Sequence, residues 1–352
     1  MTSADEELAF LGATALARLV RTRQLSPVDL VNLYLSRIER LDGRLGSFIT
    51  VCGDEARRAA REAEQALARG GAVGPLHGLP FAAKDQFDAA GLRTTAGSRL
   101  LADAPAARED ATAVARLRAA GAILLGKLNL SEFAFGGTVS FPFGQPRNPW
   151  NLEHHPGGSS GGSGIATAAA LAAFTLGEDT GGSIRGPAAN CGVVGLRATW
   201  GLISRHGAWS VSWSMDVGGP LTRTVSDTAL VLEALAGHDP KDPLTSRRPM
   251  PRYRAALGED ARGLRVGVIR ELTLGEGTEA EVRSAVLEAA RVLAKQGAAV
   301  EEISLPTLPR SGAVFMAICD PEGAAAHQSW LRTRPGDYDR ATRRRLYTAS
   351  LL

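Results

Sequence analysis

The chain is 352 residues long, with 44% hydrophobic and 22% charged residues, a balance that excludes an intrinsically disordered protein. No apolar run approaches the length of a membrane-spanning helix, and a net charge of +3 is too small to indicate nucleic-acid binding. The N-terminus lacks the basic start and apolar segment of a signal peptide, so the cytoplasm is the expected compartment. Cys52, Cys191 and Cys319 lie far apart and are expected to be reduced core thiols.

The N-terminal part of the chain is predicted to be mainly helical. Apolar residues recur at helical spacing over 7–20 and 27–41, and a charged helix is expected over 54–68. A short apolar run at 48–51 predicts a strand between the second and third helices. The glycine-rich residues 70–74 are expected to end this region.

Strands and helices alternate in the next part of the chain. The apolar segment 79–83 predicts a buried strand that places Lys84 and Asp85 at its end. A helix over 111–120 and then a strand over 122–125 indicate a parallel sheet. Further downstream we expect helices over 165–174, 226–236, 279–296 and 338–352, and strands over 193–196, 264–269 and 299–303.

Residues 156–187 contain two serine- and glycine-rich loops on either side of an alanine-rich segment. The first loop, 157–164, has no side chain larger than a hydroxymethyl group, so it can fold tightly and bring its amides close to a ligand. It lacks the Gly-Lys-Ser/Thr ending of a nucleotide P-loop, which argues against phosphate binding. In the second loop, Ser183 follows two glycines whose amides can stabilise an oxyanion, which makes Ser183 a candidate nucleophile.

A serine nucleophile needs a base that takes its proton, and histidine is the usual one. None of the histidines lies in a Gly-x-Ser-x-Gly context or a recognisable triad order; they are His77, His154, His155, His206, His238 and His327. Lys84 is the better candidate, because burial after an apolar strand would lower its pKa and leave part of it neutral. The chain otherwise uses arginine for nearly all of its positive charges, which makes each lysine informative.

Several motifs together resemble the amidase signature family: Gly78-x-Pro80-x-x-x-Lys84-Asp85, Gly157-Gly158-Ser159-Ser160-Gly161-Gly162-Ser163, Asp179-Thr180-Gly181-Gly182-Ser183-Ile184-Arg185, Gly126-Lys127-x-Asn129, Cys191-Gly192-x-x-Gly195-Leu196 and Gly219-Pro220-x-x-Arg223. The resemblance runs from about residue 7 to the end of the chain. It implies an α/β fold with a mixed, largely parallel central sheet covered by helices on both faces. It also implies hydrolysis of carboxylic amides through an acyl-enzyme intermediate.

The resemblance assigns roles to individual residues. Ser183 would be the nucleophile, Ser159 the relay serine with an unusual cis peptide, and Lys84 the base of a Ser-cisSer-Lys triad. Backbone amides from Thr180 to Ser183, including those of Gly181 and Gly182, would form the oxyanion hole. No metal or organic cofactor is implied.

Three side chains are candidate substrate-binding residues: Phe135, Ser160 and Arg185. Phe135 falls where the family tends to line its substrate channel, although an aromatic residue after a strand is more often part of the core. Arg185 could hold a substrate carboxylate or brace the loop, and bracing is the commoner role for an arginine beside glycines.

Other charged residues have structural interpretations. Lys127 at a strand end is interpreted as a structural hydrogen-bond donor rather than a second base. Asp85 and Asp179 are expected to organise loops by accepting bonds from nearby amides. A group of C-terminal arginines is interpreted as a solvated helix face rather than a nucleic-acid patch; it comprises Arg340, Arg343, Arg344 and Arg345.

The resemblance leaves more than one function open. The first is a stand-alone amidase acting on a small or arylalkyl amide, and the second is the glutaminase subunit of a tRNA-dependent amidotransferase. Residues 129–136 only loosely resemble the amidotransferase form, which favours the first. The third is a non-catalytic binding or scaffold protein with the same fold. The intact Lys84, Ser159 and Ser183 argue against this third function.

The resemblance also implies partners and a domain organisation for the chain. The expected substrate is a small-molecule amide, and we expect neither direct binding of nucleic acid nor a membrane. The candidate protein partner is a second copy of the chain. Under the alternative function, the partners are the other amidotransferase subunits. We expect a single amidase domain over 1–352, with N-terminal helices in 1–70, a catalytic core over 75–237 and a C-terminal part over 262–352. Family members are usually longer, so we expect this last part to be incomplete.

Overall fold

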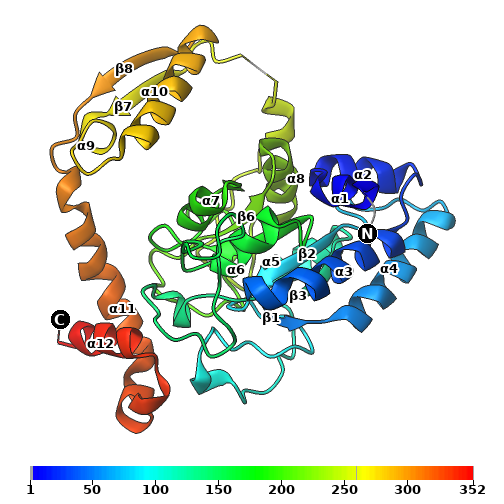
Figure 1. Ribbon diagram of the computed structural model, residues 1–352, viewed down its shortest axis with the longest axis horizontal. Helices are drawn as coiled ribbons and strands as arrows, with labels where there is room; N and C mark the ends of the chain where they lie inside the picture. The colour runs from blue at the N-terminus through cyan, green and yellow to red at the C-terminus, as the bar shows by residue number, and fades with distance from the viewer. Residues whose placement is uncertain (1–2, 259, 352) are drawn as a thin grey trace. The chain divides into compact units, whose positions relative to one another are not determined.

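The computed structural model describes residues 3–258 and 260–351, which form two compact units (Figure 1). The first unit contains the described residues up to 254 together with those from 319 onward, and the second contains the described residues within 255–318. The expected catalytic core, 75–237, lies within the first unit, whereas the expected C-terminal part, 262–352, is divided between the two.

A six-stranded sheet forms the centre of the first unit, in the order β1 (Phe48–Val51), β3 (Ile123–Leu128), β2 (Pro80–Lys84), β4 (Phe174–Glu178), β6 (Gly218–Thr222) and β5 (Val194–Gly195). Strand β2 is parallel to both β3 and β4. Strands β1 and β6 are antiparallel to the strands they pair with. Following these pairings, β2, β3, β4 and β5 point the same way, so the sheet is mixed with mostly parallel strands, which confirms the expected fold class.

The helices of the first unit are α1 (Ser3–Phe10), α2 (Ala13–Arg21), α3 (Pro27–Leu45), α4 (Gly53–Ala68), α5 (Thr112–Ala119), α6 (Gly161–Ala168), α7 (Arg185–Cys191), α8 (Val225–Leu235) and α12 (Arg340–Ala349), with short 3₁₀ helices at Arg99–Leu101, Glu132–Ala134 and Pro335–Asp337. Helices α3 and α6 contact β2, α4 and α5 contact β3, and α8 contacts β6. Every residue of β2, β3, β4 and β6 is buried. Because side chains alternate between the two faces of a sheet, both faces of these strands are covered.

The predicted first helix, 7–20, is two helices in the structure. Helix α1 ends at Phe10, and α2 begins at Ala13 after Gly12. The Thr14 amide donates to Oδ1 of Asp227 at 2.7 Å, so a buried carboxylate of α8 caps the start of α2. A Cβ atom at Gly12 would lie 2.7 Å from the same carboxylate. The prediction of one continuous helix is wrong because this cap comes from a distant part of the chain.

The alanine-rich segment is a shorter helix than predicted. Helix α6 ends at Ala168 rather than at 174, and Ala170 has a left-handed φ of 50°. The chain then enters β4, where Phe174 pairs with Phe81 of β2 and the two rings stack with centroids 5.6 Å apart. Alanine favours a helix locally, but pairing with a central strand overrides that preference.

Most of the other predicted elements of the first unit are confirmed. The strand at 48–51 is β1, and the helix over 54–68 corresponds to α4. The parallel pairing expected after the helix over 111–120 is that of β2 and β3. Residues 218–222, where no strand was expected, form β6. The last predicted helix is α12, and residue 352 lies outside the described residues.

The second unit contains a two-stranded parallel sheet of β7 (Arg265–Ile269) and β8 (Ala299–Ile303). In Figure 1 these strands lie side by side with α9 (Arg270–Thr273) and α10 (Ala280–Lys295) beside them. The sequence predicted strands over 264–269 and 299–303 and a helix over 279–296. All three elements are confirmed. The remaining elements are 3₁₀ helices at Tyr253–Ala256 and Leu308–Arg310, and α11 (Ser311–Thr333), which includes the boundary between units.

Within 3–258 and 260–351, no helix combines the length and the apolar character that crossing a bilayer requires.

Candidate active site

The ends of two neighbouring parallel strands bring Lys84 and Glu178 together. Lys84 is the last residue of β2, and Glu178 is the last residue of β4. The two strands are paired in parallel, with Ala83 opposite Leu176. Their carboxyl ends therefore meet at the same edge of the sheet, where side chains from separate strands can form one site.

The Lys84 ammonium lies in a fully buried and polar pocket. Its Nζ donates to Ser159 Oγ at 2.8 Å, to the Glu178 carbonyl oxygen at 3.3 Å and to Glu178 Oε2 at 3.1 Å. The side chain of Lys84 is 0% exposed. Burial lowers the pKa of Lys84, and the neighbouring Glu178 carboxylate opposes this by raising it. The net direction is downward, toward the neutral amine that a general base requires.

The first serine-glycine loop, 157–164, carries Ser159 and continues into the first turn of α6. The peptide bond between Gly158 and Ser159 is cis, as the family resemblance implied. Ser159 and Ser160 are both buried. The Ser160 hydroxyl donates to the carbonyl of Glu178 at 3.0 Å, and its amide donates to the carbonyl of Ser183 at 3.1 Å. Ser160 therefore joins the two loops and the end of β4.

The second loop places Ser183 beside the first loop, through the amide of Ser160. Ser183 is half-buried. Its hydroxyl makes no hydrogen bond to any residue within the described ranges, so the geometry links Lys84 to Ser159 directly and Ser183 only through the backbone contact of the loops.

The expected oxyanion donors fall into two groups. The Gly182 amide donates to Asp179 Oδ1 at 2.6 Å. Among the residues that the structure describes, the amides of Thr180, Gly181 and Ser183 have no hydrogen-bond acceptor. Gly181 is exposed, and Gly182 has a φ of 126°, which favours glycine. Three amides of this turn therefore have no acceptor within the described part of the chain, while the fourth bonds to Asp179 and holds the turn together.

Asp179 organises the second loop, as predicted from the sequence. It is buried and accepts bonds from the amides of Gly182, Ile184 and Arg185. The Arg185 guanidinium binds both carboxylate oxygens at 3.0 Å, although this arginine side chain is 55% exposed. Burial would raise the pKa of Asp179, but the hydrogen bonds from the Arg185 side chain and the amides lower it. The structure thus gives Arg185 the bracing contact.

Phe135 lies in an aromatic cluster that also contains Phe133, Trp209, His327, Trp330 and Tyr338. Its ring is buried, with the His327 ring centroid 5.8 Å away. The Arg345 guanidinium lies over the Phe135 ring at 5.3 Å and pairs with Asp320 at 2.5 Å. Arg345 is therefore not part of a solvated arginine face, which corrects that expectation for this residue. Its half-buried position depends on residues distant in sequence.

Lys127 has the structural contacts predicted for it. Its buried Nζ lies 2.6 Å from Asp85 Oδ1 and donates to Thr94 Oγ1 at 3.1 Å. Asp85 also accepts from the amide of Thr95 at 2.9 Å. This buried ion pair holds the segment after β2 against β3 and does not reach Ser159 or Ser183.

Two carboxylates of the site were not anticipated from the sequence: Glu178 and Asp216. Thr180 Oγ1 lies 2.7 Å from Oε1 of Glu178 and 2.7 Å from Oδ1 of Asp216. Burial, with the nearby Glu178 charge, raises the pKa of Asp216 to about 6. Glu178 could have been found from the sequence as the residue before the Asp-Thr-Gly-Gly-Ser motif, but only with β4 correctly predicted.

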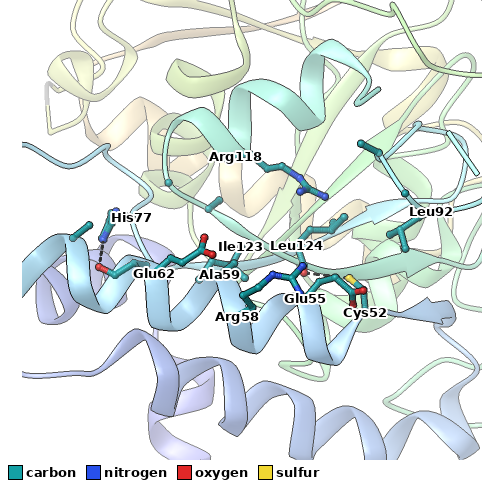
Figure 2. Close-up of a pocket in the computed structure, with 16 residues that line it drawn as sticks. Cys52, Glu55, Arg58, Ala59, Glu62, His77, Leu92, Arg118, Ile123 and Leu124 are labelled. Atoms are coloured by element: carbon teal, nitrogen blue, oxygen red, sulfur yellow. Dashed lines mark hydrogen bonds between the residues drawn. The ribbon is translucent and has the colours of Figure 1, made fainter. Parts of the chain in front are cut away.

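Two cavities of the structure differ in whether residues of the candidate site line them. A cavity of about 660 Å³ is lined mainly by α4 and by residues 90–92 and 121–124, and none of the three triad candidates lines it (Figure 2). Figure 2 shows two polar groups of this cavity that bond to backbone: the His77 ring to the Ala63 carbonyl and the Cys52 thiol to the Leu124 carbonyl. Glu178 and Asp216 are among the residues that line a second cavity, of about 230 Å³.

A family model described as amidase matches residues 29–347. The chain belongs to the amidase signature family. This confirms the family expected from the motifs. The six-stranded mixed sheet described above is thus the sheet of an amidase signature fold, which the matching solved structures share.

Relatives with different activities match this amidase signature chain. It is 48% identical over 302 residues to the A subunit of glutamyl-tRNA(Gln) amidotransferase from Moorella thermoacetica, covering 85% of this chain and 61% of the relative. A structure from work on a vestigial protein complex and the origins of an s-triazine catabolic enzyme is 37% identical, with a TM-score of 0.92, covering 97% of this chain and 74% of that one. Peptide amidase from Stenotrophomonas maltophilia is 37% identical, with a TM-score of 0.82, covering 92% and 68%.

The chain spans about three fifths of the length of the curated relatives that it matches.

Proposed function

We propose that this protein hydrolyses a carboxylic amide C–N bond through an acyl-enzyme on Ser183. The observation that carries the proposal is the hydrogen bond of 2.8 Å between the buried Lys84 Nζ and Ser159 Oγ. When Lys84 is neutral, the same contact lets the Ser159 hydroxyl donate its proton to Nζ. Membership of the amidase signature family supports the reaction class.

The proposed first half-reaction forms the acyl-enzyme. Lys84 takes the proton of Ser159, Ser159 takes the proton of Ser183, and Ser183 Oγ bonds to the amide carbonyl carbon. The free amides of the Thr180–Ser183 turn bind the resulting oxyanion. The proton returns through Ser159 to the amine nitrogen, the C–N bond breaks, and the amine leaves. Water then hydrolyses the ester by the same relay.

The residues implied by the family for substrate binding remain part of this proposal. Arg185 and the Phe135 region are candidates for contacts with the acyl group, although the contacts described above also give both a packing role. Ser160 supports the site by joining the two loops. The amide substrate, the cytoplasmic location and a second copy of the chain as partner are likewise proposals.

A glutaminase subunit of an amidotransferase is the second candidate. It is favoured by the 48% identity to a protein of that name in Moorella thermoacetica. The peptide amidase likeness, with a TM-score of 0.82, favours the stand-alone amidase. Assay of glutamine and a panel of arylalkyl and peptide amides, each with and without co-expressed partner subunits, separates them. Glutaminase activity that appears only with partners would place the amidotransferase first.

The test of the nucleophile is a comparison of Ser183→Ala with wild type. We expect amide hydrolysis to fall by several orders of magnitude and labelling of Ser183 by a serine-directed fluorophosphonate to disappear. Ser36→Ala, at an exposed position on α3, is the matched control and should behave as wild type. If Ser183→Ala keeps hydrolysis within about tenfold of wild type, the nucleophile is another residue. A wild type inert to both probe and amide panel would favour the non-catalytic scaffold.

A further inference from the structure

Glu178 occupies two of the three directions in which the Lys84 ammonium can donate. An ammonium has three N–H donors, and those of Lys84 are directed to the Glu178 carbonyl, to Glu178 Oε2 and to Ser159 Oγ. When Lys84 is a neutral amine, two N–H groups remain for Glu178 and the lone pair faces Ser159. Glu178 therefore orients the atom that would accept the Ser159 proton.

The same carboxylate also acts on the charge of Lys84. The distance from Nζ to Oε2 is 3.1 Å, and the two side chains are 0% and 3% exposed. At this separation in a buried site, an anion favours the charged form of its partner. Glu178 thus opposes the effect of burial on Lys84, which favours the neutral amine.

The other charged groups near this pair have their own partners. Asp179 is held by Arg185, and Arg197 lies 3.4 Å from it. Asp216 accepts from Ser210 and from the amides of Val211 and Ser212. Around the adjoining cavity, Arg205 pairs with Asp242, and Lys241 and His206 pair with Glu109. Among the described residues, Glu178 is the one carboxylate that makes an ion pair with Lys84.

Thr180 connects Glu178 to Asp216. One hydroxyl proton cannot serve both carboxylates, so a second proton is needed to satisfy the 2.7 Å contacts on both sides of Thr180. Burial and the nearby Glu178 charge raise the pKa of Asp216 to about 6, so Asp216 can take up this proton as the pH falls toward 6. Thr180 can then donate to Oε1 of Glu178, whose Oε2 lies 3.1 Å from Lys84 Nζ. Both carboxylates line the 230 Å³ cavity described above.

We propose that Glu178 is a positioning residue that controls the protonation of Lys84 and thereby sets the lower pH boundary of acylation at Ser183. This inference rests on the proposed function of the site, in which Lys84 is the base and Ser183 the nucleophile. A purely structural ion pair would stabilise the fold without moving that boundary.

The test is the pH dependence of Ser183 phosphonylation by a fluorophosphonate in Glu178→Gln, a reaction that also needs the Ser183 proton to be removed. Glutamine keeps the size of the side chain and removes its charge, so the Lys84 ammonium loses its anionic partner. We expect the acid limb of the profile to move to lower pH by about one to three pH units. Glu178→Asp, which keeps the charge, should leave the limb close to that of wild type. The exposed Glu39→Gln on α3 is the matched control for loss of one negative charge.

A second readout does not depend on reactivity. The chain contains only four lysines, so labelling with ε-¹³C lysine should give four signals, and Lys84→Met assigns that of Lys84. In Glu178→Gln the Lys84 signal should titrate at lower pH than in wild type. Coincident Lys84 titrations in folded wild type and Glu178→Gln would overturn the inference. A wild type that never reacts with the fluorophosphonate would instead contradict the proposed function, while the titration would still judge the role of Glu178.

Discussion

Burial changes the acid–base behaviour of two side chains that lie far apart in the chain, Lys84 and His327. Lys84 is surrounded by polar partners, so the effect of burial is partly opposed by Glu178. His327 lies among aromatic rings, and its Nδ1 pairs with the Tyr338 hydroxyl at 2.8 Å. Its Nε2 is buried without a hydrogen-bond partner among the described residues. Burial lowers the pKa of His327 from 6.5 to about 4.

His327 should make stability depend on pH. Between about pH 4 and pH 6.5 the unfolded chain binds a proton at this residue and the folded chain does not. The free energy of unfolding therefore falls as the pH is lowered through this window, by at most about 3 kcal/mol. In His327→Gln the loss on acidification should be smaller, as measured by urea unfolding across the window. The exposed His154→Gln is the control, and equal pH slopes in wild type and His327→Gln would contradict this account.

At the scale of single elements, close backbone contacts position helix α6 and the loop that carries Ser159. The Gly162 amide donates to the Asn129 carbonyl at 2.9 Å, which ties the first turn of α6 to the end of β3. A Cβ atom at Gly162 would lie 2.4 Å from the Ser47 carbonyl oxygen and 2.6 Å from backbone atoms of Asn129. These neighbours are backbone and cannot move aside cheaply, so only glycine fits this approach.

Gly162→Ala is therefore expected to destabilise the protein by about 1–3 kcal/mol, because α6 must shift away from β3. The shift would also displace Ser159 from Lys84 and lower the rate of Ser183 labelling. Gly43→Ala is the matched control, since nothing lies within 4 Å of its Cβ position in α3. It should stabilise the helix by about 0.5–1 kcal/mol. Unfolding curves that place Gly162→Ala at or above wild type would refute the packing argument.

At the scale of the whole molecule, the two units differ in how much of their sheet is buried. Every residue of β2 and β3 is buried, whereas no residue of β7 or β8 is. Helix α10, which contacts both of these strands, has Ala290 as its buried residue. A two-stranded sheet has little apolar burial to oppose local opening.

Hydrogen exchange should therefore be faster in the second unit. Peptides covering 265–269 and 299–303 are expected to exchange well before those covering 80–84 and 123–128, as measured by mass spectrometry on the full chain. The two sets are compared in the same sample, which makes the first unit the internal control. Equal protection of both sets would show that the second unit is stabilised by contacts beyond its own sheet.

Much of the candidate site could be predicted from sequence because its motifs are local. The glycines and serines of 157–163 and 179–185 carry their chemistry in adjacent residues, and the apolar segment before Lys84 indicated burial. The match of the amidase family model to residues 29–347 confirms the family that these motifs predicted. The roles of Lys84, Ser159 and Ser183 stay predictions, although the structure brings the first two within 2.8 Å.

The sequence by itself determined the motifs, most strands and helices, and the family, since each depends on residues that are neighbours in the chain. Only the tertiary structure decided that α6 ends at Ala168, that Asp227 caps α2, and that Glu178 faces Lys84. These features depend on strand pairing and on contacts between residues tens to hundreds of positions apart. Local propensity carries no information about such contacts, because their free energy comes from surfaces that meet only after the chain has folded.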